Sequence, residues 1–174
     1  MDLDFLLTLA QGSSRCGTTV DRIVEHIYGS KGWEGRDLML EYFGDEENDF
    51  PKLYFGHLSY AEYVIDNIQQ ALNKHFLCSI SLDNSWAYGP EGLPTFDHTF
   101  LLYQKQNEIY RIESYINEYC PRWTNDPFFL DKLYCLIISK PGVQRLKQWN
   151  NLFNVSVTED TEEYPLSVYL TVFE

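Results

Sequence analysis

Three side chains of this chain could together carry out nucleophilic chemistry, and the first of them is Cys16. It follows a short break at residues 12–14 and precedes an amphipathic segment, so we expect it at the start of a helix. Unpaired N–H groups at a helix N-terminus stabilise an anion, and the neighbouring Arg15 adds positive charge. This setting favours the thiolate, which is the reactive form of cysteine.

A thiol nucleophile needs a base, and His98 is the best placed of the four histidines. It is expected to open the first strand of a hairpin, directly after a loop, where functional side chains are common. An imidazole can accept a thiol proton near neutral pH, and a carboxylate often orients the ring. Glu113, which follows His98 by 15 residues (113 − 98), is the candidate for that role.

The geometry of a hairpin supports the pairing of His98 with Glu113. Side chains alternate between the two faces of a sheet, so register determines which of them meet. If the connecting loop has an even number of residues, positions whose numbers have an odd sum share a face. A two-residue loop at 105–106 would put the pair directly opposite, and a four-residue loop would put it on a diagonal. A three-residue loop with a bulge would separate the two side chains.

Each of these residues also has an ordinary structural interpretation. Cys16 could be a half-buried cysteine before a helix, and His98 could be a strand-end residue bonded to Asp97. Glu113 could form an ion pair with Arg111, which is two residues away on the same face. The sequence leaves these alternatives open.

The order and spacing of the motifs resemble the papain-like cysteine hydrolase superfamily, and the His-to-acid spacing is similar to that of its transglutaminase-like branch. The resemblance rests on residues 11–17 and 97–115. It implies that Cys16 is the nucleophile, His98 the base and Glu113 the residue that orients the imidazole. It also implies that Gln11 and the Cys16 N–H bind the oxyanion, and that the fold has a papain-like or transglutaminase-like core.

Aromatic residues in predicted loops are candidates for substrate contact. Trp86 and Tyr88 lie in the Gly- and Pro-containing segment 83–97, and Trp33 lies in another predicted loop. In the catalytic interpretation, Trp86 and Tyr88 line a substrate groove beside His98. In the structural interpretation, they pack over the edge of the sheet.

The pattern of apolar residues predicts a single α+β domain, with N-terminal helices packed on an antiparallel sheet. We expect helices at 17–28, 36–43, 59–74, 124–139 and 143–153, and a short one within 2–10. Ser59 is the expected N-cap of the third of these. Strands are expected at 76–82, 98–104, 109–116, 154–157 and 166–173.

Composition limits the partners of the chain. Among its 174 residues, acids outnumber bases by 26 to 13, which gives a formal charge of −13. Such a charge disfavours binding to nucleic acid or to an anionic membrane surface. It permits a protein substrate or a basic protein partner. A non-catalytic acidic protein that sequesters a basic partner, as immunity and inhibitor proteins do, is therefore the alternative to the enzyme.

The cysteines predict neither metal nor disulfide chemistry. Cys16, Cys78, Cys120 and Cys135 form no CxxC pair, and no two histidines have ligand spacing. We expect free thiols, no metal and no cofactor. The acidic N-terminus does not resemble a secretory signal, and no apolar run has the roughly 20 residues of a membrane helix. The expected location is the cytoplasm.

Overall fold

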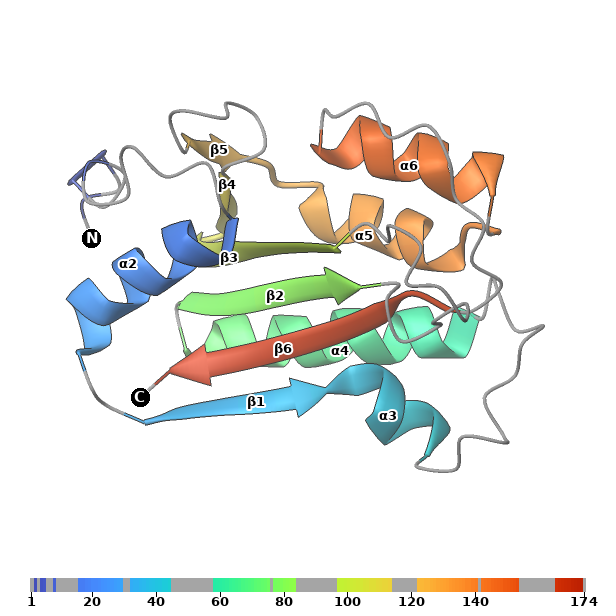
Figure 1. Cartoon of the computed structure of the whole chain (residues 1–174), viewed down its shortest axis with the longest axis horizontal. Coiled ribbons are helices and arrows are strands. Elements are labelled where there is room, and N and C mark those ends of the chain that lie inside the picture. The colour runs from blue at the N-terminus through green and yellow to red at the C-terminus, as the bar shows by residue number, and fades with distance from the viewer. Residues whose placement is uncertain are drawn as a thin grey trace.

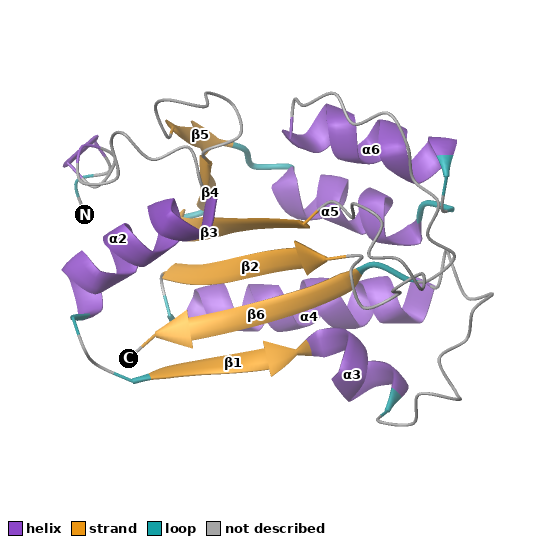
Figure 2. Cartoon of the chain, viewed as in Figure 1, coloured by secondary structure: helices purple, strands orange, loops and turns teal. Residues whose placement is uncertain are grey.

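The computed structural model describes residues 2, 4–5, 8, 16–29, 32–44, 58–75, 77–83, 97–113, 122–140, 142–153 and 165–173. Its helices surround one six-stranded sheet, in which every neighbouring pair of strands is antiparallel. The predicted α+β class is therefore confirmed (Figure 2). Within these ranges, no helix is both long enough and apolar enough to cross a membrane.

The sheet has the strand order β1-β6-β2-β3-β4-β5 (Figure 1). Its strands are β1 (Trp33–Asp37), β2 (Leu77–Asp83), β3 (Asp97–Lys105), β4 (Glu108–Glu113), β5 (Arg122–Asn125) and β6 (Ser167–Phe173). The helices that pack on this sheet are α2 (Cys16–Tyr28), α3 (Leu38–Phe43), α4 (Leu58–Lys74), α5 (Phe129–Ile138) and α6 (Val143–Phe153). The last strand, β6, pairs with both β1 and β2.

The main core lies on one face of the sheet, which we call the core face. Its strand residues occupy alternate positions, such as Ile80 in β2, Phe100 in β3 and Leu170 in β6, and all three are fully buried. Helices α3, α4, α5 and α6 contribute the other side of this core. Burial of such apolar side chains is the main stabilising contribution to a domain of this size.

Helix α2 packs on the opposite face, which we call the α2 face. Val20 and Ile23 of α2 form a second, smaller cluster with Leu101 and Tyr103 of β3. In Figure 1, α2 crosses in front of the sheet while α4 runs behind it. The sheet therefore separates α2 from the other helices.

Helix α4 follows from its amphipathic pattern. Its buried side chains, which include Val64, Ile68 and Leu72, recur at helical spacing and face the core. The hydroxyl of Tyr60 donates a 2.7 Å hydrogen bond to the carbonyl of Leu166, which ties the helix to the start of β6. The predicted helix is confirmed, but it begins at Leu58, so Ser59 lies inside its first turn and is not its N-cap.

Two edge strands differ from the sequence predictions. Residues 33–37 form β1, so Trp33 is a strand residue and the expected helix at 36–43 begins only at Leu38. Asp37 caps that helix by accepting a 3.0 Å hydrogen bond from the N–H of Leu40. Residues 122–125 form β5, so the expected helix at 124–139 begins at Phe129. The predicted strand at 154–157 lies outside the described residues.

The β3–β4 hairpin has a two-residue turn, Gln106 and Asn107, between the paired residues Lys105 and Glu108. Gln106 has a φ of 57°, in the left-handed region that glycine adopts at little cost. A non-glycine residue in this region costs roughly 1–2 kcal/mol. The turn therefore holds some backbone strain.

Replacing Gln106 by glycine should relieve this strain. Because glycine also gains freedom in the unfolded chain, we expect Gln106→Gly to raise the free energy of unfolding by a net amount of about 0.5 kcal/mol, measured by urea denaturation. The control is Asn107→Gly, whose φ is not positive, and it should lower stability by about 0.5 kcal/mol or more. If both changes stabilise the protein, or if neither does, the backbone at Gln106 is not strained.

Candidate functional site

The hairpin brings His98 and Glu113 together. Because Lys105 pairs with Glu108, residues whose numbers sum to 213 (105 + 108) are directly opposite, and His98 and Glu113 lie on a diagonal of the same face. The Nε2 atom of His98 and the Oε1 atom of Glu113 form a buried hydrogen bond. Each residue is about 1% exposed. The expected shared face is thus confirmed, although the turn falls one residue later than a 105–106 loop.

Glu113 also faces Arg111, so both partners considered from the sequence are present. The Nε atom of Arg111 lies 3.7 Å from Oε2 of Glu113, which is an ion pair but not a hydrogen bond. Glu113 is thus held between a histidine and an arginine. A carboxylate buried to this degree needs such partners, because removing its charge from water is costly.

Arg111 connects the hairpin to both C-terminal helices. Its Nη1 atom donates a 2.9 Å hydrogen bond to the carbonyl of Leu152 in α6. Its guanidinium lies over the rings of Phe129 and Phe153, at 5.0 and 5.5 Å from their centroids. Cation–π contacts of this kind gain strength where water is excluded. Arg111 therefore holds α5 and α6 against β4.

The charged chain continues to the surface through Asp126. One carboxylate oxygen of Asp126 lies 3.9 Å from Nη2 of Arg111, and both oxygens accept hydrogen bonds from the Lys132 ammonium at 3.0 and 3.1 Å. The side chain of Lys132 is 53% exposed. Asp126 and Lys132 were not among the residues predicted from the sequence. The turn Asn125–Asp126–Pro127 before α5 was the available signal for Asp126.

Aromatic side chains enclose the imidazole of His98. The ring of Phe153 meets it edge-on with centroids 4.8 Å apart, Phe100 stacks on it at 5.5 Å, and Trp149 lies at 6.5 Å. Phe100 comes from β3, and the other two rings come from α6. His98 therefore lies inside the core face, between the hairpin and α6.

Helix α2, which begins at Cys16, and the side chain of His98 lie on opposite faces of the sheet. The helix that begins at Cys16 packs on the α2 face through Val20 and Ile23, whereas the His98 imidazole lies on the core face. Side chains alternate along β3, so Leu101 contacts α2 while His98 and Phe100 point the other way. The side chain of Cys16 lies outside the described residues, so the expected contact of its thiol with the imidazole stays a prediction.

The other predicted site residues lie outside the described part of the chain. This holds for Gln11, Trp86 and Tyr88, and for the side chain of Cys16. The structure therefore places neither the expected oxyanion site nor the expected groove beside His98.

The described thiols are of two kinds. Cys78 is fully buried on the core face, and this burial raises the pKa of its thiol to about 12. A thiol with such a pKa is almost entirely protonated at neutral pH and does not act as a nucleophile. Cys135 lies on α5 and is exposed. Across the described ranges, no group of three His, Cys, Asp or Glu side chains is arranged to hold a metal ion.

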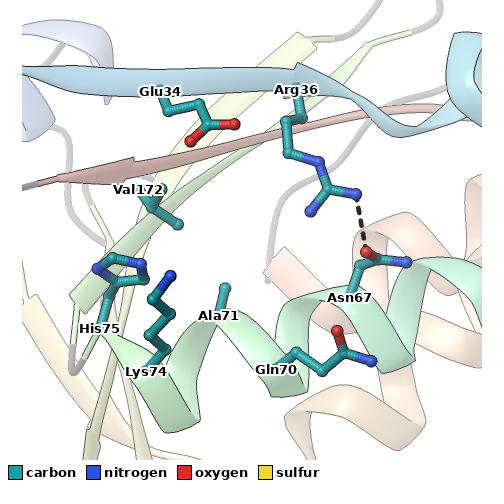
Figure 3. Close-up of a pocket in the computed structure, with 8 residues that line it drawn as sticks. All are labelled: Glu34, Arg36, Asn67, Gln70, Ala71, Lys74, His75 and Val172. Atoms are coloured by element: carbon teal, nitrogen blue, oxygen red, sulfur yellow. Dashed lines mark hydrogen bonds between the residues drawn. The ribbon is translucent and has the colours of Figure 1, made fainter.

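A polar depression lies between β1 and α4, and Figure 3 shows its lining. Its volume is about 250 Å³, and Lys74 and His75 border it at the end of α4. Arg36 points into it from β1, but its guanidinium donates hydrogen bonds to Glu41 at 2.9 and 2.6 Å and to Asn67 at 2.8 Å. The bond from Arg36 lowers the pKa of the Glu41 carboxyl. The positive charge of Arg36 is therefore already compensated by the Glu41 carboxylate.

A larger groove lies on the α2 face, with a volume of about 430 Å³. Asp21 borders it from α2, Trp33 from β1 and Tyr169 from β6. Its floor carries hydroxyl side chains, of which Ser81 and Thr99 lie 3.0 Å apart as hydrogen-bond partners. A site of this size falls within the range of small-ligand pockets.

Comparison of the chain with protein-family models, with curated protein sequences and with solved structures finds no match.

The buried His98–Glu113 pair should be important for stability. Glu113→Gln removes the carboxylate charge and leaves the buried Arg111 and His98 poorly compensated, so we expect a loss of about 3–5 kcal/mol in the free energy of unfolding. Urea denaturation measures this loss. The matched control is Glu62→Gln, an exposed site on α4, with an expected change within about 0.5 kcal/mol. Equal unfolding midpoints for the two variants would contradict the structural role of the pair.

Proposed function

We propose that this chain is a non-catalytic acidic binding protein that sequesters a basic protein partner. The observation that carries the proposal is the distribution of charge. The buried charged residues of the described chain are Arg111, Arg145, Glu113 and Asp126, whose charges cancel. The formal charge of −13 is therefore carried by other side chains.

Exposed acids occur on both sides of the sheet, which supports the same proposal. Asp21 and Glu25 are exposed on α2, and Glu62 and Asp66 are exposed on α4. A surface with such an excess of one sign attracts a partner of opposite charge over a distance and accelerates its association. Affinity of this origin weakens when salt screens the charges.

Salt dependence of the association rate tests this function. The probes are three small basic proteins and a nonapeptide of alternating glycine and arginine, with the corresponding glutamate peptide as control. We expect association with the basic probes to slow by at least roughly tenfold when salt rises from about 0.02 to 0.3 M, as measured by stopped-flow fluorescence.

Two outcomes would overturn the binding function. One is the absence of binding to every basic probe at the lowest salt concentration. The other is equal affinity for the arginine and glutamate peptides, which charge complementarity excludes.

The second candidate is a cysteine hydrolase or acyl-transferase that acts on protein amides, such as a protease, a deamidase or a transglutaminase-like enzyme. The observation that favours it is the bond between Glu113 and Nε2 of His98. A carboxylate on this atom orients the imidazole, and proton transfer with Cys16 would then use Nδ1. Gln11, together with the Cys16 N–H, would bind the oxyanion, and Trp86 and Tyr88 would line the groove. The start of α2 would first have to reach the core face.

Thiol alkylation separates the two candidates. In the binding protein, Cys16 should react no faster than the exposed Cys135, with a pH midpoint of about 8.5. In the enzyme, Cys16 should react faster and with a midpoint well below that value, and His98→Gln should abolish this advantage. Mass spectrometry of the alkylated peptides measures both rates. Selective labelling of Cys16 at low pH would favour the hydrolase over the binding protein.

A further inference from the structure

The groove on the α2 face exists because α2 covers only part of that face. At the covered end, alternate strand positions are apolar, for example Leu77, Leu101 and Phe173. Farther along the same rows lie Ser81, Thr99 and Thr171, whose hydroxyl side chains are half-buried. A floor of hydroxyl groups tolerates exposure and can donate and accept hydrogen bonds.

Two exposed aromatic rings form one wall of the groove. Trp33 is 67% exposed and Tyr169 is 39% exposed. Both rings lie close over Gly35, where an added Cβ would be 2.6 Å from the Tyr169 hydroxyl oxygen, 2.7 Å from its Cε1 and 3.0 Å from Cζ3 of Trp33. Only glycine therefore permits this arrangement of the two rings. An exposed and specifically accommodated aromatic pair is typical of a contact surface.

The groove contains an acid but no cation. Of the side chains that line it, all from the described part of the chain, Asp21 is the only Asp, Glu, Lys, Arg or His. The depression of Figure 3 differs, because Arg36, Lys74 and His75 line it. A carboxylate near exposed aromatic faces suits a cation that can stack, and the planar guanidinium of arginine does so better than the ammonium of lysine.

We propose that this groove binds an arginine side chain from an exposed segment of the basic partner. The guanidinium stacks on Trp33 and Tyr169 and pairs with the Asp21 carboxylate, and the hydroxyl floor contacts the backbone of the segment. This inference rests on the proposed binding function and assigns that function to one surface. The choice of occupant follows from charge complementarity between the groove and the partner.

The test uses the whole chain and the alternating glycine–arginine nonapeptide. Asp21→Asn and Trp33→Ala each remove one contact, and both sites are exposed, so the variants should fold. We expect each to raise the Kd for the peptide by about three- to fivefold, measured by calorimetry, since cation–π and ion-pair contacts at exposed sites are of this order. Gly35→Ala, which displaces Tyr169, should have a similar effect.

Matched controls change the same residue types elsewhere. Asp131→Asn removes an exposed aspartate on α5, and Trp123→Ala removes a partly exposed tryptophan on β5. Each should change the Kd by less than about twofold. A peptide with citrulline in place of arginine keeps the shape but loses the charge, and it should bind at least fivefold more weakly to the unaltered protein.

The outcomes distinguish the groove from the general binding function. If the arginine peptide binds but the groove variants behave like the controls, the groove is not the site and the acidic surface elsewhere carries the affinity. If citrulline and arginine peptides bind equally, the groove binds a neutral ligand and the proposal fails. If no basic probe binds the unaltered protein, the binding function itself fails.

Discussion

Successive side chains of a β-strand point to opposite faces of a sheet, and in this chain the two faces have different chemical character. The core face holds the His98 imidazole and the buried charges of Glu113 and Arg111 among aromatic rings. The α2 face holds an apolar cluster at one end and an open groove with a hydroxyl floor at the other. The face that a strand residue occupies therefore determines whether its side chain joins the buried charges or the open groove.

Charged side chains can be buried in this core because they lie next to one another as ion pairs. Glu113, Arg111 and Asp126 each lie next to a group of opposite sign, and the series ends at the exposed ammonium of Lys132. Such a network adds little net stability compared with apolar packing, but it strongly disfavours arrangements that leave a charge unpaired. We infer that it fixes the position of α5 and α6 on the hairpin, because Arg111 contacts both helices.

Some of this architecture could be predicted from the sequence, for physical reasons that differ between elements. The shared face of His98 and Glu113 was predictable, because strand periodicity and a short loop leave few alternatives. The edge strands β1 and β5 were not, because their pairing partners are supplied by other segments and their own residues carry little pattern. The face that α2 occupies was not predictable either. An amphipathic helix can cover either side of a sheet, and its own residues do not determine which side it covers.

The position of β6 has a consequence for synthesis of the protein. Strand β1 is made early, yet its neighbour in the sheet is β6, whose residues 167–173 are translated more than a hundred positions later. Because β6 also pairs with β2, it joins β1 to the other four strands of the sheet. During synthesis, the β3–β4 hairpin can form before β6 is made, whereas β1 stays unpaired until β6 has been translated. Chaperone binding during this interval would protect it from non-native pairing.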